Sequence, residues 1–170
     1  MSAGERARGA AARIELLVAV ALVLVVGALY AQTRLHGFVS FDDGSYIVQN
    51  PHVNTGLSLE NARWAFTEFH SANWHPLTWL SHQLDVQLFA LAAGKHHLMS
   101  VALHALNAVL CFLFLRRATG SLWASALVAL LFAVHPQRVE SVAWAAERKD
   151  VLSGLFWMLC LLAYAAWAKR

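Results

Sequence analysis

Four hydrophobic runs dominate this sequence, and their lengths limit the architectures that the chain can adopt. The runs lie at about residues 16–33, 98–115, 118–134 and 151–168. At about 1.5 Å per residue, a helix of about 18 residues reaches about 27 Å, close to the hydrocarbon thickness of a bilayer. Soluble domains carry about 25% charged residues, whereas this chain has 14% charged and 59% hydrophobic residues. We predict an all-α integral membrane protein with about four transmembrane helices.

The first run allows two interpretations. Val26-Gly27-Ala28 loosely resembles a signal-peptidase site, so the run could be a cleaved signal peptide. The run is long for a signal sequence, however, and three further apolar runs follow it. We favour an uncleaved first helix that is preceded by a short cytoplasmic tail over residues 1–15, with the membrane domain extending over residues 16–170.

The alternation of spans and loops predicts the topology. It places the tail, the Arg116-Arg117 turn and the C-terminus on one side, and loops 34–97 and 135–150 on the other. Basic residues lie tightly against the span ends on the first side, which is typical of the cytoplasmic face. We therefore expect a multi-pass protein of the inner (cytoplasmic) membrane with two extracytoplasmic loops. Because the basic residues flank spans and form no stripe, we expect no nucleic-acid partner.

The first loop is too long to be a simple connector, and it contains signals for two helices. Ser58 is suited to cap a helix that carries Trp64 and Phe66. Pro76 is suited to the first turn of a second helix, which should end near Gly94. Both segments have an apolar stripe, so we predict amphipathic helices that contact membrane lipid.

The second loop has an unusually high density of ionisable side chains for a connector between two spans. Glu140, Trp144 and Glu147 recur at helical spacing. This spacing predicts one short helix that presents acidic and basic groups on one side.

The acidic and basic residues of the two loops form the predicted site. Adjacent carboxylates at Asp42 and Asp43 can activate an incoming hydroxyl or hold a divalent cation such as Mg²⁺ or Mn²⁺, and Glu140 would join them. Cations beside carboxylates suit a phosphate leaving group. The candidates for binding that phosphate are Arg138, Arg148 and Lys149. The simpler alternative is that the two aspartates only cap a turn.

Several histidines raise the possibility of a metal site, but their spacing does not support one. No Cys or carboxylate completes a known ligand spacing among His75, His82, His96, His97 and His104. We therefore assign no metal ligand among these histidines. We expect His104 and Asn107, inside the second span, to hydrogen-bond to neighbouring helices.

Short motifs in the spans and loops resemble those of one family. They are Phe41-Asp42-Asp43, Asn73-Trp74-His75-Pro76-Leu77-Thr78-Trp79, Leu103-His104-Ala105-Leu106-Asn107, Val139-Glu140-Ser141-Val142-Ala143-Trp144 and Glu147-Arg148-Lys149-Asp150. Together they resemble the N-terminal region of bacterial membrane proteins that join a glycosyltransferase-like spanning domain to tetratricopeptide repeats. They are also similar to the eukaryotic transmembrane and tetratricopeptide-repeat O-mannosyltransferases. The resemblance covers about residues 38–168.

This resemblance implies a GT-C fold and an activity. The implied activity is transfer of a sugar from a polyprenyl-phosphate donor to a protein or glycan acceptor on the extracytoplasmic face. It implies catalytic roles for Asp42 and Asp43, and places Glu140 and Arg148 in the donor-side pocket. Ala90 and Ser100 stand where the family often has Gly and Asn. Because members of the family have more spans, we expect the chain to be the N-terminal part of a longer enzyme, inactive by itself.

Two functions from other classes remain as alternatives. A transporter would place ionisable groups near the middle of the membrane. The span interiors are nearly free of such groups, with His104 the only deep candidate, which disfavours transport. A non-catalytic membrane anchor or assembly partner remains the alternative to the enzyme.

Overall fold

The computed structural model describes residues 3–168, and the regular elements within this range are all helical. In chain order they are α1 (Ala3–Tyr30), η1 (Ala31–Leu35), η2 (Gly44–Val48), α2 (Pro51–Asn54), α3 (Leu59–Thr67), α4 (Pro76–Phe89), α5 (Ala93–Thr119), α6 (Leu122–Val134), α7 (Arg138–Ala143), η3 (Ala145–Glu147) and α8 (Arg148–Trp167). The predicted all-α class is confirmed. Lys169 and Arg170, expected on the cytoplasmic flank, lie outside the described residues.

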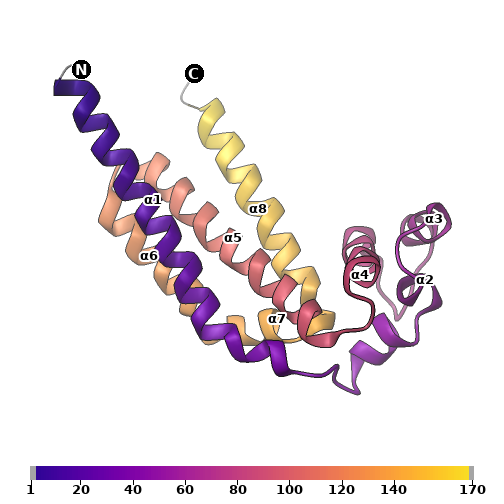
Figure 1. Ribbon diagram of the computed structural model, residues 1–170. Helices are drawn as coiled ribbons and strands as arrows, with labels where there is room; N and C mark the ends of the chain where they lie inside the picture. The colour runs from indigo at the N-terminus through magenta and orange to yellow at the C-terminus, as the bar shows by residue number, and fades with distance from the viewer. Residues whose placement is uncertain (1–2, 169–170) are drawn as a thin grey trace.

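Helices α1, α5, α6 and α8 form a bundle in which α5 is central and contacts the other three (Figure 1). Its core contains fully buried side chains such as Val26, Ala108, Phe112 and Ala129. Small residues such as the two alanines let helix backbones approach closely where lipid surrounds them. The many apolar side chains exposed on the outer faces of α1 and α6 are consistent with a lipid environment.

Within the described residues, three helical segments are long and apolar enough to cross a membrane. They are Gly9–Leu35, Ala93–Thr119 and Ala145–Trp167. The third predicted span, at about residues 118–134, corresponds to α6, an apolar helix of 13 residues, which reaches only about 20 Å at the usual rise. Gly120, with φ 73°, ends α5 in the left-handed conformation and allows the tight turn into α6.

Polar side chains inside the bundle join α5 to its neighbours. His104 Nε2 lies 3.0 Å from the carbonyl oxygen of Ala133 in α6. Asn107 donates from Nδ2 to the carbonyl oxygen of Val151 in α8 at 2.8 Å. The predicted hydrogen bonds of these two residues to neighbouring helices are confirmed.

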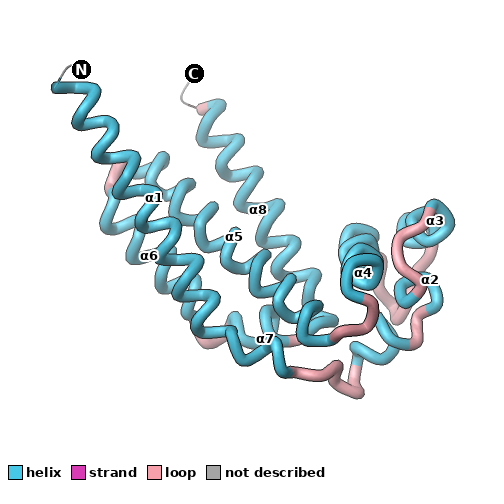
Figure 2. The backbone as a smooth tube through the Cα atoms, in the orientation of Figure 1, coloured by secondary structure: helices cyan, strands magenta, loops and turns pink. Residues whose placement is uncertain are grey.

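The two loops lie at the same end of the bundle. In Figure 1 the described ends of the chain lie together at one end, and α2, α3, α4 and α7 lie at the other. Most of the irregular segments between helices gather at this second end, and the turn between α5 and α6 lies at the first (Figure 2). Loops 34–97 and 135–150 therefore share one face, where their side chains can form a common site.

The first loop folds into short helices. Ser58 Oγ accepts the backbone N–H of Asn61 at 3.0 Å, which caps α3. Pro76 occupies the first turn of α4. Both predicted helix starts are confirmed. Trp79 is fully buried in a second apolar core that also includes Ile47, Ala145 and Ala146, so the two loops share this core.

The second loop does not form the single helix that its spacing predicted. Helix α7 ends at Ala143, and Trp144 is extended with φ −103° and ψ 123°. The chain then makes a short 3₁₀ turn, η3, before α8 begins at Arg148. The prediction of one helix was wrong because Ala145 and Ala146 pack into the shared core, which requires the chain to change direction at Trp144.

Candidate functional site

Asp43 holds the two loops together. Its carboxylate is fully buried. Oδ2 accepts the backbone N–H of Val39 at 2.9 Å, and Oδ1 accepts the backbone N–H of Ala146 at 2.8 Å. Because both oxygens are engaged by the protein, Asp42 and Asp43 do not present two free carboxylates side by side. The pair is therefore a poor fit for the Mg²⁺ or Mn²⁺ ion considered from the sequence.

Asp42 has a different environment from its neighbour. It is half-buried, and within the described part of the chain no hydrogen bond engages its carboxylate. Its charge acts on the nearby hydroxyl of Tyr46, which accepts a hydrogen bond from Asn73 Nδ2 at 2.7 Å. Burial raises the pKa of Tyr46; Lys149 opposes this shift, and Asp42 adds to it. Asp42 is thus the carboxylate of the predicted pair that is available for chemistry.

Lys149 lies near the same hydroxyl. Its ammonium group donates a hydrogen bond to Glu147 Oε1 at 2.6 Å. About a third of the Lys149 side chain is exposed. Its positive charge also acts on His75. Burial and this charge lower the pKa of His75 to about 4, so the imidazole is neutral at neutral pH. Asp42, Tyr46, His75 and Lys149 therefore form one polar group, which we call the Tyr46 cluster.

The Tyr46 cluster borders an apolar groove. One hollow of about 580 Å³ is lined by His75 and Lys149. It shares lining residues with a larger hollow of about 830 Å³ that Ser81 and Asp85 also line. The apolar side chains of the combined groove include Leu77, Leu84, Met99, Leu103, Leu152 and Phe156. A groove of this kind can hold a hydrocarbon chain with a polar group at one edge.

Arg148 is fully buried and bonded to the protein on several sides. Its guanidinium donates to Asp85 Oδ2 at 2.5 Å and to the backbone oxygen of His96 at 2.6 Å. It also donates to Ser81 Oγ at 3.0 Å and Ser100 Oγ at 3.1 Å. These bonds use four of the five N–H groups that an arginine has. Such burial disfavours the direct phosphate contact that the sequence suggested, and it favours a positioning role.

Arg138 and Glu140 belong to α7. The guanidinium of Arg138 lies 4.7 Å from the ring centre of Phe132. Arg138 lines a separate hollow with Ser141 and Asp150, and Glu140 is exposed. The structure therefore brings Asp42 and Lys149 to one cluster but does not bring the six predicted site residues together.

Sequence reasoning missed several residues near the groove. His75 belongs to a quoted motif and Tyr46 follows Asp43 by three residues, but neither received a role in the predicted site. Asp85 follows His82 by three residues in α4, a spacing that places both on one helix face. Asp85 is therefore a carboxylate beside one of the histidines, and the three-residue spacing from His82 is the signal that could have found it.

Comparison with known proteins identifies the relatives of this chain. Protein O-mannosyl-transferase TMTC3 of Mus musculus is 34% identical over 154 residues, which cover 84% of this chain and 16% of that protein. TMTC3 of Homo sapiens is 34% identical over 164 residues, covering 90% and 17%. TMTC1 of Mus musculus is 34% identical over 175 residues, covering 95% and 18%. This chain is a relative of the protein O-mannosyl-transferases.

The resemblance of the motifs to the O-mannosyltransferases is thereby confirmed. The chain spans about a sixth of the length of these O-mannosyl-transferase relatives. No family model matches the chain, and no solved structure matches it.

Proposed function

We propose that this chain is part of a GT-C-type membrane glycosyltransferase that uses a polyprenyl-phosphate sugar donor. The acceptor is a hydroxyl group of a protein or glycan on the extracytoplasmic face of the inner membrane. The relatives are named for mannosyl transfer to protein, so mannose is the first sugar to test. The observation that carries the proposal is the position of the Tyr46 cluster at the edge of the apolar groove.

The groove and Lys149 suit the two parts of the donor. The apolar walls accommodate a polyprenyl chain, while Lys149 lies at the edge where a phosphate would meet water. An ammonium group gives a strong charge-assisted hydrogen bond to phosphate. It also stabilises the negative charge that develops on the phosphate as the bond between its oxygen and the sugar breaks.

Asp42 is the proposed general base. The acceptor oxygen attacks the anomeric carbon of the sugar, its proton passes to the Asp42 carboxylate, and the polyprenyl phosphate leaves with the bonding electron pair. A carboxylate that is half-buried and that no described residue engages by a hydrogen bond is suited to take this proton. Asp43 and Arg148 act indirectly, because they join the loops and helices that position Asp42 and Lys149.

A transfer assay tests the proposal. The native protein at its full natural length is expressed in membranes and given a labelled polyprenyl-phosphate mannose. We expect Asp42→Asn to lower the transfer rate by about 100-fold or more, since general bases contribute about 10²–10⁴-fold. Glu68→Gln is the matched control, because Glu68 is exposed at the end of α3. If Asp42→Asn transfers mannose at the same rate as the wild type and Glu68→Gln, Asp42 is not the base. If the wild-type protein itself transfers no mannose, a non-catalytic anchor becomes the better account.

A further inference from the structure

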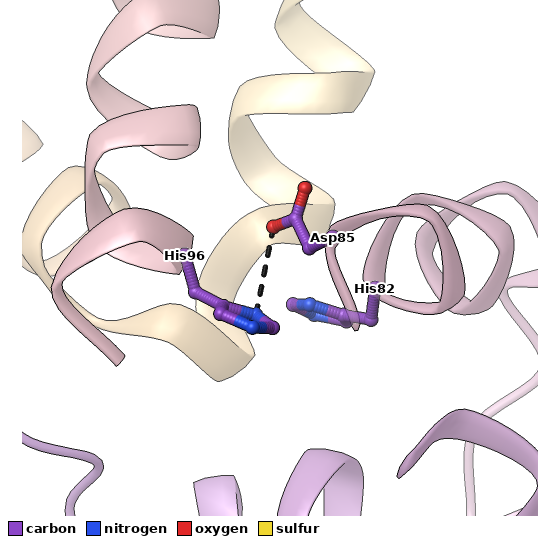
Figure 3. A group of neighbouring side chains, drawn as sticks. All are labelled: His82, Asp85 and His96. Atoms are coloured by element: carbon purple, nitrogen blue, oxygen red, sulfur yellow. Dashed lines mark ion pairs between the residues drawn. The ribbon is translucent and has the colours of Figure 1, made fainter. Parts of the chain in front are cut away.

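Three buried side chains between α4 and α5 face one another (Figure 3). They are His82 and Asp85 from α4 and His96 from the first turns of α5. Each offers a ligand atom, and these atoms lie within 4.8 Å of one another. All three side chains are no more than 1% exposed. Figure 3 shows the imidazole of His96 close to the Asp85 carboxylate, with the ring of His82 beside them.

Several polar atoms of this group have no protein partner in the described part of the chain. They are both ring nitrogens of His82, Oδ1 of Asp85 and Nδ1 of His96. Buried polar atoms nearly always have a partner, and a group that lacks one indicates a role or an occupant. Other described residues also have buried atoms without a partner, but these three residues bring ligand atoms within 4.8 Å of one another, so a single occupant can contact all three.

The protonation of His96 indicates what the occupant must supply. His96 Nε2 lies 2.8 Å from the carbonyl oxygen of Ala90. A carbonyl oxygen can only accept, so Nε2 carries the hydrogen, and in the neutral ring Nδ1 has a lone pair. This Nδ1 lies 3.6 Å from Asp85 Oδ2. Arg148 already supplies a positive partner to Oδ2. His96 Nδ1 and Asp85 Oδ1 have no partner in the described part of the chain, and a positive species that both can bind would stabilise them.

We propose that His82, Asp85 and His96 bind a divalent transition-metal ion of the zinc type. Two imidazoles and one carboxylate match the ligands that such ions prefer, with one position left for water. Mg²⁺ and Ca²⁺ prefer oxygen ligands and are a poor match. The bond from His96 to Ala90 fixes the tautomer that leaves Nδ1 free for a metal, as in many histidine metal sites.

Arg148 weakens the affinity of this site for a metal ion but does not block the site. Its guanidinium occupies Asp85 Oδ2, whereas Oδ1 has no protein partner and remains available. Because one carboxylate is shared between the guanidinium and the ion, the ion binds more weakly than at a closed structural zinc site. Asp85 also lines the apolar groove, which gives the ion an access route. The bound ion would link α4 to α5 directly beside Arg148.

Cobalt titration of the full chain in detergent tests the site. Co²⁺ reports a tetrahedral nitrogen and oxygen environment through its visible absorption, and Zn²⁺ should displace it. His82→Gln is the informative variant, because both nitrogens of His82 lack protein partners and their loss breaks no hydrogen bond. His97→Gln is the matched control, since His97 is equally buried in α5 but does not belong to the group whose ligand atoms lie within 4.8 Å of one another.

We expect the wild type and His97→Gln to bind one Co²⁺, and Zn²⁺ to raise the thermal midpoint of both. We expect His82→Gln to bind at least about 10-fold more weakly, a loss that even changes outside the ligand shell can cause. Absence of visible Co²⁺ absorption in the wild type would overturn the proposal without any variant. Equal binding by His82→Gln, or sulfur charge-transfer absorption from a cysteine ligand, would also overturn it.

Discussion

Asp43 accepts the backbone N–H of Ala146 at 2.8 Å, although the two residues are 103 positions apart in the chain. The same carboxylate accepts the N–H of Val39. One buried side chain therefore docks the second loop onto the first. This contact separates the two adjacent aspartates into a structural residue, Asp43, and a chemically available one, Asp42.

Substitution of Asp43 should lower stability. Asp43→Ala leaves two backbone N–H groups without an acceptor in a buried setting, at a cost of about 1–3 kcal/mol for each. We expect the thermal midpoint in detergent, followed by circular dichroism, to fall clearly. Asp42→Asn is the control and should change the free energy of unfolding by less than about 0.5 kcal/mol. A stable Asp43→Ala protein with no transfer activity would instead give Asp43 a direct chemical role.

Gly94 is required by a close approach between α5 and the segment that follows α1. A Cβ atom at this position would overlap the carbonyl oxygen of Arg34 and lie 2.8 Å from its carbonyl carbon. We expect Gly94→Ala to destabilise the protein by about 1–3 kcal/mol, as overpacking usually does.

Gly27→Ala is the matched control, because no atom lies within 4 Å of the Cβ that it would add. Alanine is favoured over glycine inside a helix, so this variant should be as stable as the wild type or slightly more so. Chemical unfolding in detergent gives both values. Equal stability of the two variants would mean that the contact between Gly94 and Arg34 is looser in solution.

His75 should make stability depend on pH. Its pKa is about 4 in the folded protein, against an ordinary value of 6.5. Between these values the unfolded chain binds a proton that the folded chain does not, so stability is lost as pH falls from about 6.5 to about 4. His82, whose pKa burial also lowers, acts in the same direction, whereas Asp85, whose pKa burial raises, acts in the opposite direction.

Comparison with His75→Gln isolates the contribution of His75. The wild type should lose more stability than this variant between pH 6.5 and pH 4 in thermal unfolding experiments. Parallel pH profiles for the two proteins would show that His75 is equally easy to protonate in both states.

Local signals predicted local structure well. The Ser58 cap and Pro76 start depend on hydrogen bonds and backbone geometry within a few residues. His104 and Asn107 were predicted to bond between helices because polar groups inside an apolar span need partners. The two helix starts could be predicted from a few neighbouring residues, and the two interhelical hydrogen bonds from the apolar surroundings of the polar groups.

Long-range contacts could not be predicted in the same way. The break at Trp144 follows from packing of Ala145 and Ala146 against the first loop. Arg148 pairs with Asp85, which lies 63 positions away in the chain. Because the sequence does not show this partner, the charge of Arg148 is interpreted there as free to bind a phosphate. Ala90 adopts φ 51°, a conformation that favours glycine. The Gly that is common at this position in the resembling family fits that backbone better.

The donor affinity of Lys149→Ala tests the central claim most directly. The claim is that Lys149, at the edge of the apolar groove, binds the phosphate of the donor. A charge-assisted hydrogen bond contributes about 1.5–3 kcal/mol, so the KM for polyprenyl-phosphate mannose should rise by roughly 10-fold or more. Lys95→Ala is the control, because Lys95 is exposed beside Phe89 and away from the groove. An unchanged KM in Lys149→Ala, with kcat also unchanged, would contradict the account.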